Sequence, residues 1–95
     1  MTTNSNMDIQ KILEERNETH GSFIDNARVS QELKAVLRAS PNWDKMHNIH
    51  REALEYICGK MGRICSGQFD FDDSWKDCAG YAELPIKFKH GKETT

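Results

Sequence analysis

The 95-residue chain has 37% hydrophobic and 29% charged residues, which makes it polar for a globular protein without giving it a disordered composition. Its 13 basic and 15 acidic side chains are mixed along the sequence, with a formal net charge of −2, so broad non-specific binding to nucleic acid is disfavoured. The N-terminal decapeptide MTTNSNMDIQ has no apolar run and no window approaches the roughly 20 apolar residues of a membrane span, which disfavours export and membrane insertion.

Two helices are predicted before Pro41. The first begins near Ser5 or Asn6 and ends before Gly21, because apolar residues recur at helical spacing and a glycine can adopt the positive φ of a turn. The second begins after Ser22, a capping residue, and ends before Pro41, since proline disfavours helical geometry in the residue that precedes it. Its core-facing stripe is expected to contain Phe23, Ala27, Ser30, Leu33 and Leu37.

Two further helices are predicted after Pro41. The apolar pattern of Trp43–Cys65 indicates one long helix or two pieces broken near Asn48, with a stop at Ser66–Gly67. A fourth helix opens in the acidic stretch Asp70–Asp73 and is expected to end at Pro85. The predicted fold is therefore all-α, a small bundle of four or five helices with little or no strand. The side chains expected in its core include Trp43, Trp75, Cys78, Ala79 and Ala82.

The length of the chain predicts a single helical domain over residues 1–95, with flexible ends at about 1–5 and 86–95. A domain of this size buries only about 60 to 65% of its unfolded surface, so we expect a homo-oligomer, a dimer or larger. The cysteines are odd in number and form no CxxC pair, which is typical of free thiols in a reducing cytoplasm. Buried positions are expected for all three, Cys58, Cys65 and Cys78.

Acidic side chains gather on one side of the fourth predicted helix. At 100° per residue, Asp70, Asp73, Asp77 and Tyr81 lie within roughly 80° of one another. The helix N-terminus stabilises the first two carboxylates by about 0.3 to 1 kcal/mol each, but Asp77 lies too far along the helix to gain much. This side is either a solvated acidic face or a site for Mg²⁺, which prefers a few carboxylates together with waters and phosphates.

The third predicted helix has a mixed polar face. Carboxylates and cations alternate there, so this face is either an exposed surface with intrahelical ion pairs or a site that binds a metal and neutralises phosphate oxygens. His20, in the first interhelical turn, is a candidate for the lip of such a site, and Tyr81 is a candidate for stacking on a base. The polar face itself contains Glu52, Glu55, Tyr56, Lys60 and Arg63.

Four stretches spread over residues 12–84, about three quarters of the chain, carry a family resemblance. They are ILEERNETHGSF (Ile12–Phe23), NWDK (Asn42–Lys45), REALEYICGKMGRICSG (Arg51–Gly67) and DDSWKDCAGYAEL (Asp72–Leu84). They resemble a group of small phage and prophage proteins. This resemblance implies a small helical protein acting during phage growth, in the cytoplasm of a bacterial host.

A more distant similarity concerns mechanism. A helix bearing Glu52-x-x-Glu55, a gap of 17 residues and a helix bearing Asp73-x-x-x-Asp77 resemble the layout of MazG-like all-α nucleoside triphosphate pyrophosphatases. That resemblance implies that Glu52, Glu55, Asp73 and Asp77 bind Mg²⁺ and that a metal-activated water cleaves between the α and β phosphates. The second pair departs from the family's usual Glu-x-x-Asp spacing.

Two functions follow as expectations. One is a Mg²⁺-dependent nucleoside triphosphate pyrophosphohydrolase, in which Lys60, Arg63, His20 and Tyr81 bind the substrate. The other is a non-enzymatic helical binding protein that engages a host protein or sequesters a ligand. Binding to nucleic acid is the least favoured function, because it needs a contiguous basic surface that the loosely grouped lysines and arginines do not predict.

Overall fold

A computed structural model describes residues 2–91, with side chains from Asp8 onward. It contains α1 (Thr2–His20), α2 (Phe23–Arg38), the short 3₁₀-helix η1 (Trp43–Lys45), α3 (Asn48–Ser66) and α4 (Asp72–Lys89). Residues 2–91 contain no strand, so the predicted all-α fold is confirmed. Within the same residues, no helix offers an apolar stretch long enough to traverse a bilayer.

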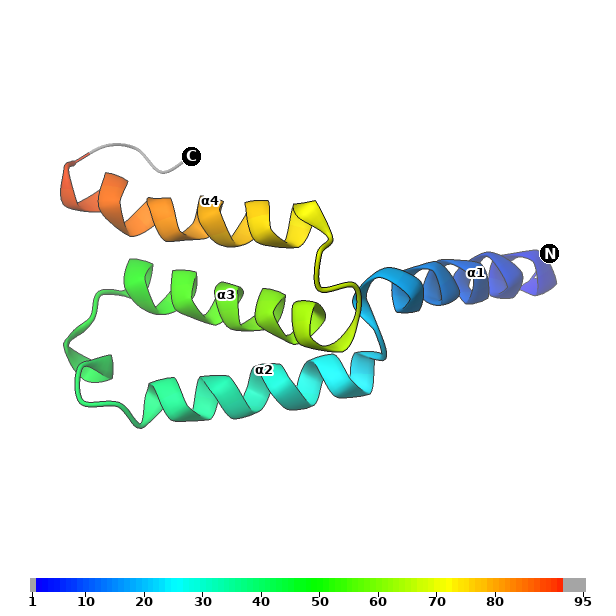
Figure 1. The fold of residues 1–95 in the computed structure, drawn as a ribbon, viewed down its shortest axis with the longest axis horizontal. Helices are drawn as coiled ribbons and strands as arrows, with labels where there is room; N and C mark the ends of the chain where they lie inside the picture. Colours follow the sequence, from blue (N-terminus) through cyan, green and yellow to red (C-terminus); the bar gives the residue numbers. More distant parts are fainter. Residues whose placement is uncertain (1, 92–95) are drawn as a thin grey trace.

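Helices α2, α3 and α4 form a layer in which successive helices run antiparallel and α3 packs against both neighbours (Figure 1). Helix α1 projects away from one end of this layer, beside the C-terminal end of α3 (Figure 1). The radius of gyration is 16.3 Å, whereas a compact domain of this length has a value of about 12 Å. The chain is therefore extended for its size, with extents of 50 × 29 × 28 Å.

Small side chains fill the contacts between the helices of the layer. Ala53 and Cys58 of α3 are each only 4% exposed, and Gly62 on the same helix is also buried. A Cβ atom added at Gly62 would lie 2.7 Å from the backbone oxygen of Asn26, so α2 and α3 approach each other closely there. The larger apolar residues of the layer, including Leu33, Leu54, Ile57 and Leu84, are only half-buried.

The two turns at one end of the layer interlock. Gly21, with φ of 77°, packs so closely on Ser66 that a Cβ atom there would overlap the Ser66 backbone. The backbone N–H of Gln68 donates to the carbonyl of Thr19 over 2.8 Å. These contacts attach the end of α1 to the end of α3, and they bring Arg16 of α1 close to the cleft described below.

Several predicted helix ends are confirmed. The Ser22 hydroxyl caps α2 by accepting from the Ile24 N–H over 3.2 Å, α1 ends at His20 and α3 ends at Ser66. The third apolar pattern forms two pieces, η1 and α3. The break before α3 is stabilised by reciprocal caps, in which His47 Nδ1 accepts from the Ile49 N–H over 3.1 Å and His50 Nδ1 accepts from the His47 N–H over 3.2 Å.

Both outer ends of the helical region differ from prediction. Helix α1 begins at Thr2 rather than at Ser5 or Asn6. Helix α4 continues through Pro85 to Lys89, so residues 86–89 are helical and not a tail. A proline removes one backbone hydrogen bond, and packing compensates here because the Phe88 ring lies 4.6 Å from the ring of His47. The remainder of the predicted tail, residues 92–95, lies outside the described residues.

The predicted buried face of α4 is wrong. Trp75 is 55% exposed, and Ala79 and Ala82 are also exposed, while Ser74 is buried and Tyr81 is half-buried against α3. Cys78, which was expected on the same face as Trp75, is half-buried. The Trp75 indole N–H instead donates to the carbonyl of Phe69 over 2.7 Å.

Two other residues expected in the core are exposed. Phe23 is the first residue of α2 and is 70% exposed, and Cys65 of α3 is also exposed. Trp43 is half-buried. The prediction of buried thiols holds for Cys58 and in part for Cys78, and burial raises the pKa of both thiols.

A candidate ligand cleft between α2 and α3

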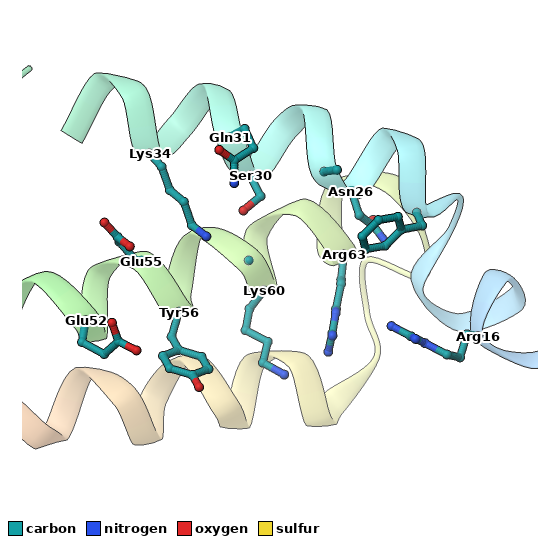
Figure 2. A pocket seen from close by; sticks show the side chains of 13 residues that line it. Arg16, Asn26, Ser30, Gln31, Lys34, Glu52, Glu55, Tyr56, Lys60 and Arg63 are labelled. Atoms are coloured by element: carbon teal, nitrogen blue, oxygen red, sulfur yellow. The ribbon is translucent and has the colours of Figure 1, made fainter. Parts of the chain in front are cut away.

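A cleft of about 440 Å³ lies between α2 and α3 beside the end of α1. Figure 2 shows Arg16 reaching from α1 toward Arg63, and Lys34 reaching from α2 toward α3. The cleft thus collects side chains from three helices. Its lining consists of Arg16, Phe23, Asn26, Ala27, Ser30, Gln31, Lys34, Glu52, Glu55, Tyr56, Gly59, Lys60 and Arg63.

Positive charge predominates in this cleft. Four cations line it. Of these four, only Lys60 has a salt bridge to another residue among residues 8–91; its partner is Asp77, over 2.8 Å. Of the two lining carboxylates, Glu55 is neutralised by Arg38, which lies outside the cleft, over 3.1 Å. The cleft therefore suits an anion with several negative groups, because its unpaired cations can form charge-assisted hydrogen bonds.

His20 responds to this concentration of charge. Its pKa is lowered mainly by burial, and then by the positive charges of Arg63, Arg16 and Lys60. The imidazole does not line the cleft; it packs edge-on against Phe71, with ring centroids 5.8 Å apart. His20 is thus placed behind the predicted site rather than at its lip, because the interlocked turns bury it.

The lowered pKa of His20 predicts a pH-dependent stability. Below its ordinary pKa of 6.5, the unfolded chain binds a proton that the folded chain does not bind, so acidification lowers the free energy of unfolding until the folded pKa is passed. We expect the melting temperature to fall as the pH is lowered through 6.5, and His20→Gln to flatten this slope.

The control for that experiment is His90→Gln, which changes an exposed histidine at the end of α4. The slope of melting temperature against pH is the informative quantity, because the loss of the contact with Phe71 can lower stability at every pH. An equal slope in wild type and His20→Gln would contradict the prediction.

An aromatic surface borders the cleft. Tyr56 lines it, is 47% exposed, and stacks on Tyr81 of α4 with ring centroids 4.4 Å apart and planes 12° from parallel. Asn26 also lines the cleft, and its side-chain Oδ1 is buried without a hydrogen-bond partner. A ligand with a flat ring would complement the exposed ring of Tyr56.

The predicted metal ligands are divided between two places. Glu52 and Glu55 line the cleft, whereas Asp73 is exposed near the start of α4. Asp77 accepts a hydrogen bond from Lys60, which lowers the pKa of its carboxyl. Asp70 precedes α4 altogether, so it does not continue the acidic face along that helix.

These placements do not form a metal cage. Among the described residues, no group of three or more histidine, cysteine, aspartate or glutamate side chains is arranged to hold a metal ion. Glu55 and Asp77 are each engaged by a cation. In this arrangement Glu52 and Glu55 line the cleft, and Asp73 and Asp77 lie on α4 outside its lining.

Part of this site could be predicted from the sequence. Glu52, Glu55, Lys60 and Arg63 share one helical face and all line the cleft. The contributions from other helices were missed, because they depend on how the interhelical turns pack. One signal was present: Lys34 follows Ser30 by four residues on the inner stripe of its helix, where a cation is unexpected unless it serves a polar cleft.

Comparisons with protein-family profiles, curated proteins and solved structures return no match for this chain. The resemblances to small phage proteins and to MazG-like pyrophosphatases thus remain predictions from the residues quoted above. The geometry of the cleft is the basis for a functional proposal.

Proposed function

We propose that this protein binds a nucleotide in the cleft between α2 and α3. The observation that carries the proposal is the gathering of four cations from three helices, only one of them paired within the described part of the chain, beside an exposed tyrosine. In this arrangement the cations bind the phosphates and Tyr56 contacts the base.

The phosphate end of the site is formed by Arg16 and Arg63. Figure 2 places their side chains at the same end of the cleft, and their joint effect on the pKa of His20 supports a shared positive potential. Guanidinium groups bind phosphate oxygens in pairs of parallel hydrogen bonds. Lys34 adds a third charge from α2, which favours a polyphosphate over a single phosphate group.

The nucleoside end is formed by Tyr56, which lies toward the Glu52 end of the cleft, away from Arg16 (Figure 2). Stacking of a base on an aromatic side chain contributes about 1 to 3 kcal/mol, and Tyr81 holds the Tyr56 ring in a fixed orientation from the side of α4.

Binding without chemistry is the activity that we propose. The predicted pyrophosphohydrolase needs carboxylates that converge on Mg²⁺, and two of its four nominated ligands are paired with cations. A protein that sequesters or senses a nucleotide needs only the cations and the aromatic face. This is the non-enzymatic function expected above, with a nucleotide as its ligand.

Thermal melting with ATP tests the proposal. In EDTA, we expect ATP to raise the melting temperature by several degrees, since a ligand at 100 times its Kd stabilises a protein by about 2.7 kcal/mol. Inorganic tripolyphosphate should give a smaller rise and adenosine the smallest. The rises with ATP and tripolyphosphate should shrink in high salt, because exposed charges are screened.

The alternatives give different patterns. No rise with millimolar ATP or tripolyphosphate would remove the nucleotide site. A rise that requires both Mg²⁺ and ATP, accompanied by release of pyrophosphate, would instead support the MazG-like function. A rise with tripolyphosphate equal to that with ATP would leave an anion site and exclude a role for Tyr56 in binding a base.

A further inference from the structure

The solvent-facing side of α4 carries a stripe of apolar residues that the described part of the chain leaves exposed. Trp75 and Ile86 are 55% and 58% exposed, and Ala79 and Ala82 between them are also exposed. We call these four residues the outer stripe. They lie roughly 130° around the helix from the residues that contact α3, and none of them lines the cleft.

We propose that the outer stripe binds the outer stripe of a second copy of this chain, with the two α4 helices antiparallel. The four residues are separated by four, three and four positions, which is the spacing of a two-helix seam. The series reads the same from both ends, so a twofold axis between Ala79 and Ala82 places Trp75 against Ile86 of the second copy. A twofold interface must be self-complementary in this way.

The sizes of the side chains suit the same register. The two alanines at the centre let the helices approach closely, and the large residues at the ends fill the space where the helices diverge. The Trp75 indole is already fixed by its 2.7 Å hydrogen bond to the Phe69 carbonyl. Its docking would therefore lose little side-chain entropy.

Charge favours the antiparallel orientation. Lys76 and Glu83 each follow a stripe residue by one position and flank the stripe on the same side. In the antiparallel pair, Lys76 follows Trp75 and faces Glu83 of the second copy, which lies between Ala82 and Ile86 of that copy. The twofold axis creates this Lys76–Glu83 pair twice. In a parallel pair the flank of the first copy that carries Lys76 would face the other flank of the second copy, so Lys76 would not meet Glu83. Flanking charges of this kind set partner choice and orientation.

The area of the chain also calls for a partner. Its accessible surface is 7253 Å², about 1,700 Å² more than a compact monomer of this mass exposes. A standard interface buries about 800 Å² on each partner, and obligate dimers bury more. A second copy is the one partner whose surface is certain to match a self-complementary stripe.

Sedimentation analysis across a wide concentration range tests the proposal. We expect wild type to form a dimer, and Ala79→Glu to raise the dimer Kd at least about 100-fold, because it buries an unpaired charge. The matched control is Ala35→Glu on α2, an exposed helical alanine outside the stripe and the cleft. It should dimerise like wild type, and far-UV circular dichroism should show both variants helical.

Charge exchange tests the orientation. Lys76→Glu should weaken the dimer by placing like charges together, and the double variant Lys76→Glu/Glu83→Lys should restore it. A monomeric wild type, equal effects of Ala79→Glu and Ala35→Glu, or a double variant no stronger than Lys76→Glu would each overturn the proposal. ATP binding by Ala79→Glu reports on the cleft alone, so the two proposals can fail separately.

Discussion

Replacing Arg63 by glutamine is expected to weaken ATP binding about 10- to 100-fold, since a hydrogen bond to a charged group contributes about 1.5 to 3 kcal/mol. Arg63 lines the cleft, acts on the pKa of His20 and has no salt bridge among the described residues. Its loss removes a cation from the ligand without leaving a carboxylate unpaired. Titration calorimetry in EDTA measures the change directly.

The matched control for this variant is Arg28→Gln. Arg28 is an exposed residue of α2 that pairs with Glu32 over 3.2 Å and does not line the cleft. It removes the same net charge, so a purely long-range effect would weaken binding equally in both variants. Equal affinities in the two variants would show that the phosphates do not contact Arg63.

The pKa of His20 offers a second readout of Arg63→Gln. Arg63 is the largest charge contribution that lowers this pKa, so the variant should raise it, as measured by NMR titration of the imidazole. Bound tripolyphosphate should raise the same pKa in wild type, because it neutralises nearby cations. A change in ATP affinity without a change in the pKa of His20 would place the bound anion elsewhere.

The substitution Asp77→Asn distinguishes the nucleotide cleft from the predicted metal site, because the two sites predict opposite changes in nucleotide affinity. A Mg²⁺ ligand would be lost in Asp77→Asn, and nucleotide binding would be lost with it. In the structure the same change releases Lys60 from its 2.8 Å salt bridge. Lys60 is then available to the phosphates, so ATP binding should tighten and not be lost.

The helix boundaries could be predicted because local chemistry fixes them. Ser22 caps α2, Gly21 adopts a positive φ, and Pro41 follows the end of the second helix. Pro85 misled the same reasoning, since a proline ends a helix only when nothing compensates for the missing hydrogen bond. The packing of Phe88 on His47 and His50 supplies that compensation, and it depends on tertiary contacts.

The inner and outer sides of α4 could not be predicted from hydrophobicity. Both sides carry large apolar residues, and two of them, Trp75 and Ile86, face solvent. The contact with α3 instead uses Ser74, the stacked Tyr81 and the ion pair of Asp77 with Lys60. An apolar stripe shows that a helix face needs a partner, but it does not show whether that partner belongs to the same chain.

Gly62→Ala is expected to destabilise the protein by about 1 to 3 kcal/mol, as overpacked cores typically do. The new methyl group would lie 2.7 Å from the backbone oxygen of Asn26, and no side-chain rotation can relieve a clash with backbone. Helix α2 must therefore move away from α3. For a domain of this size the melting temperature should fall by about 4 to 8 °C per kcal/mol.

Gly59→Ala, one turn earlier on the same helix, is the control with the opposite sign. A Cβ atom there meets nothing within 4 Å, so the alanine should stabilise α3 by up to about 1 kcal/mol through helix propensity alone. Thermal melting of both variants separates propensity from packing. An increase in stability for Gly62→Ala would mean that α2 and α3 do not approach as closely as described.

The same movement links the packing of the layer to the proposed function. Asn26 touches Gly62 and also lines the cleft, so a shift of α2 away from α3 changes the separation of Lys34 and Arg63 across the bound phosphates. We therefore expect Gly62→Ala to lower ATP affinity at temperatures where the variant is still fully folded. An ATP affinity of folded Gly62→Ala equal to that of wild type would contradict this link, because the added methyl group prevents the close contact of α2 with α3.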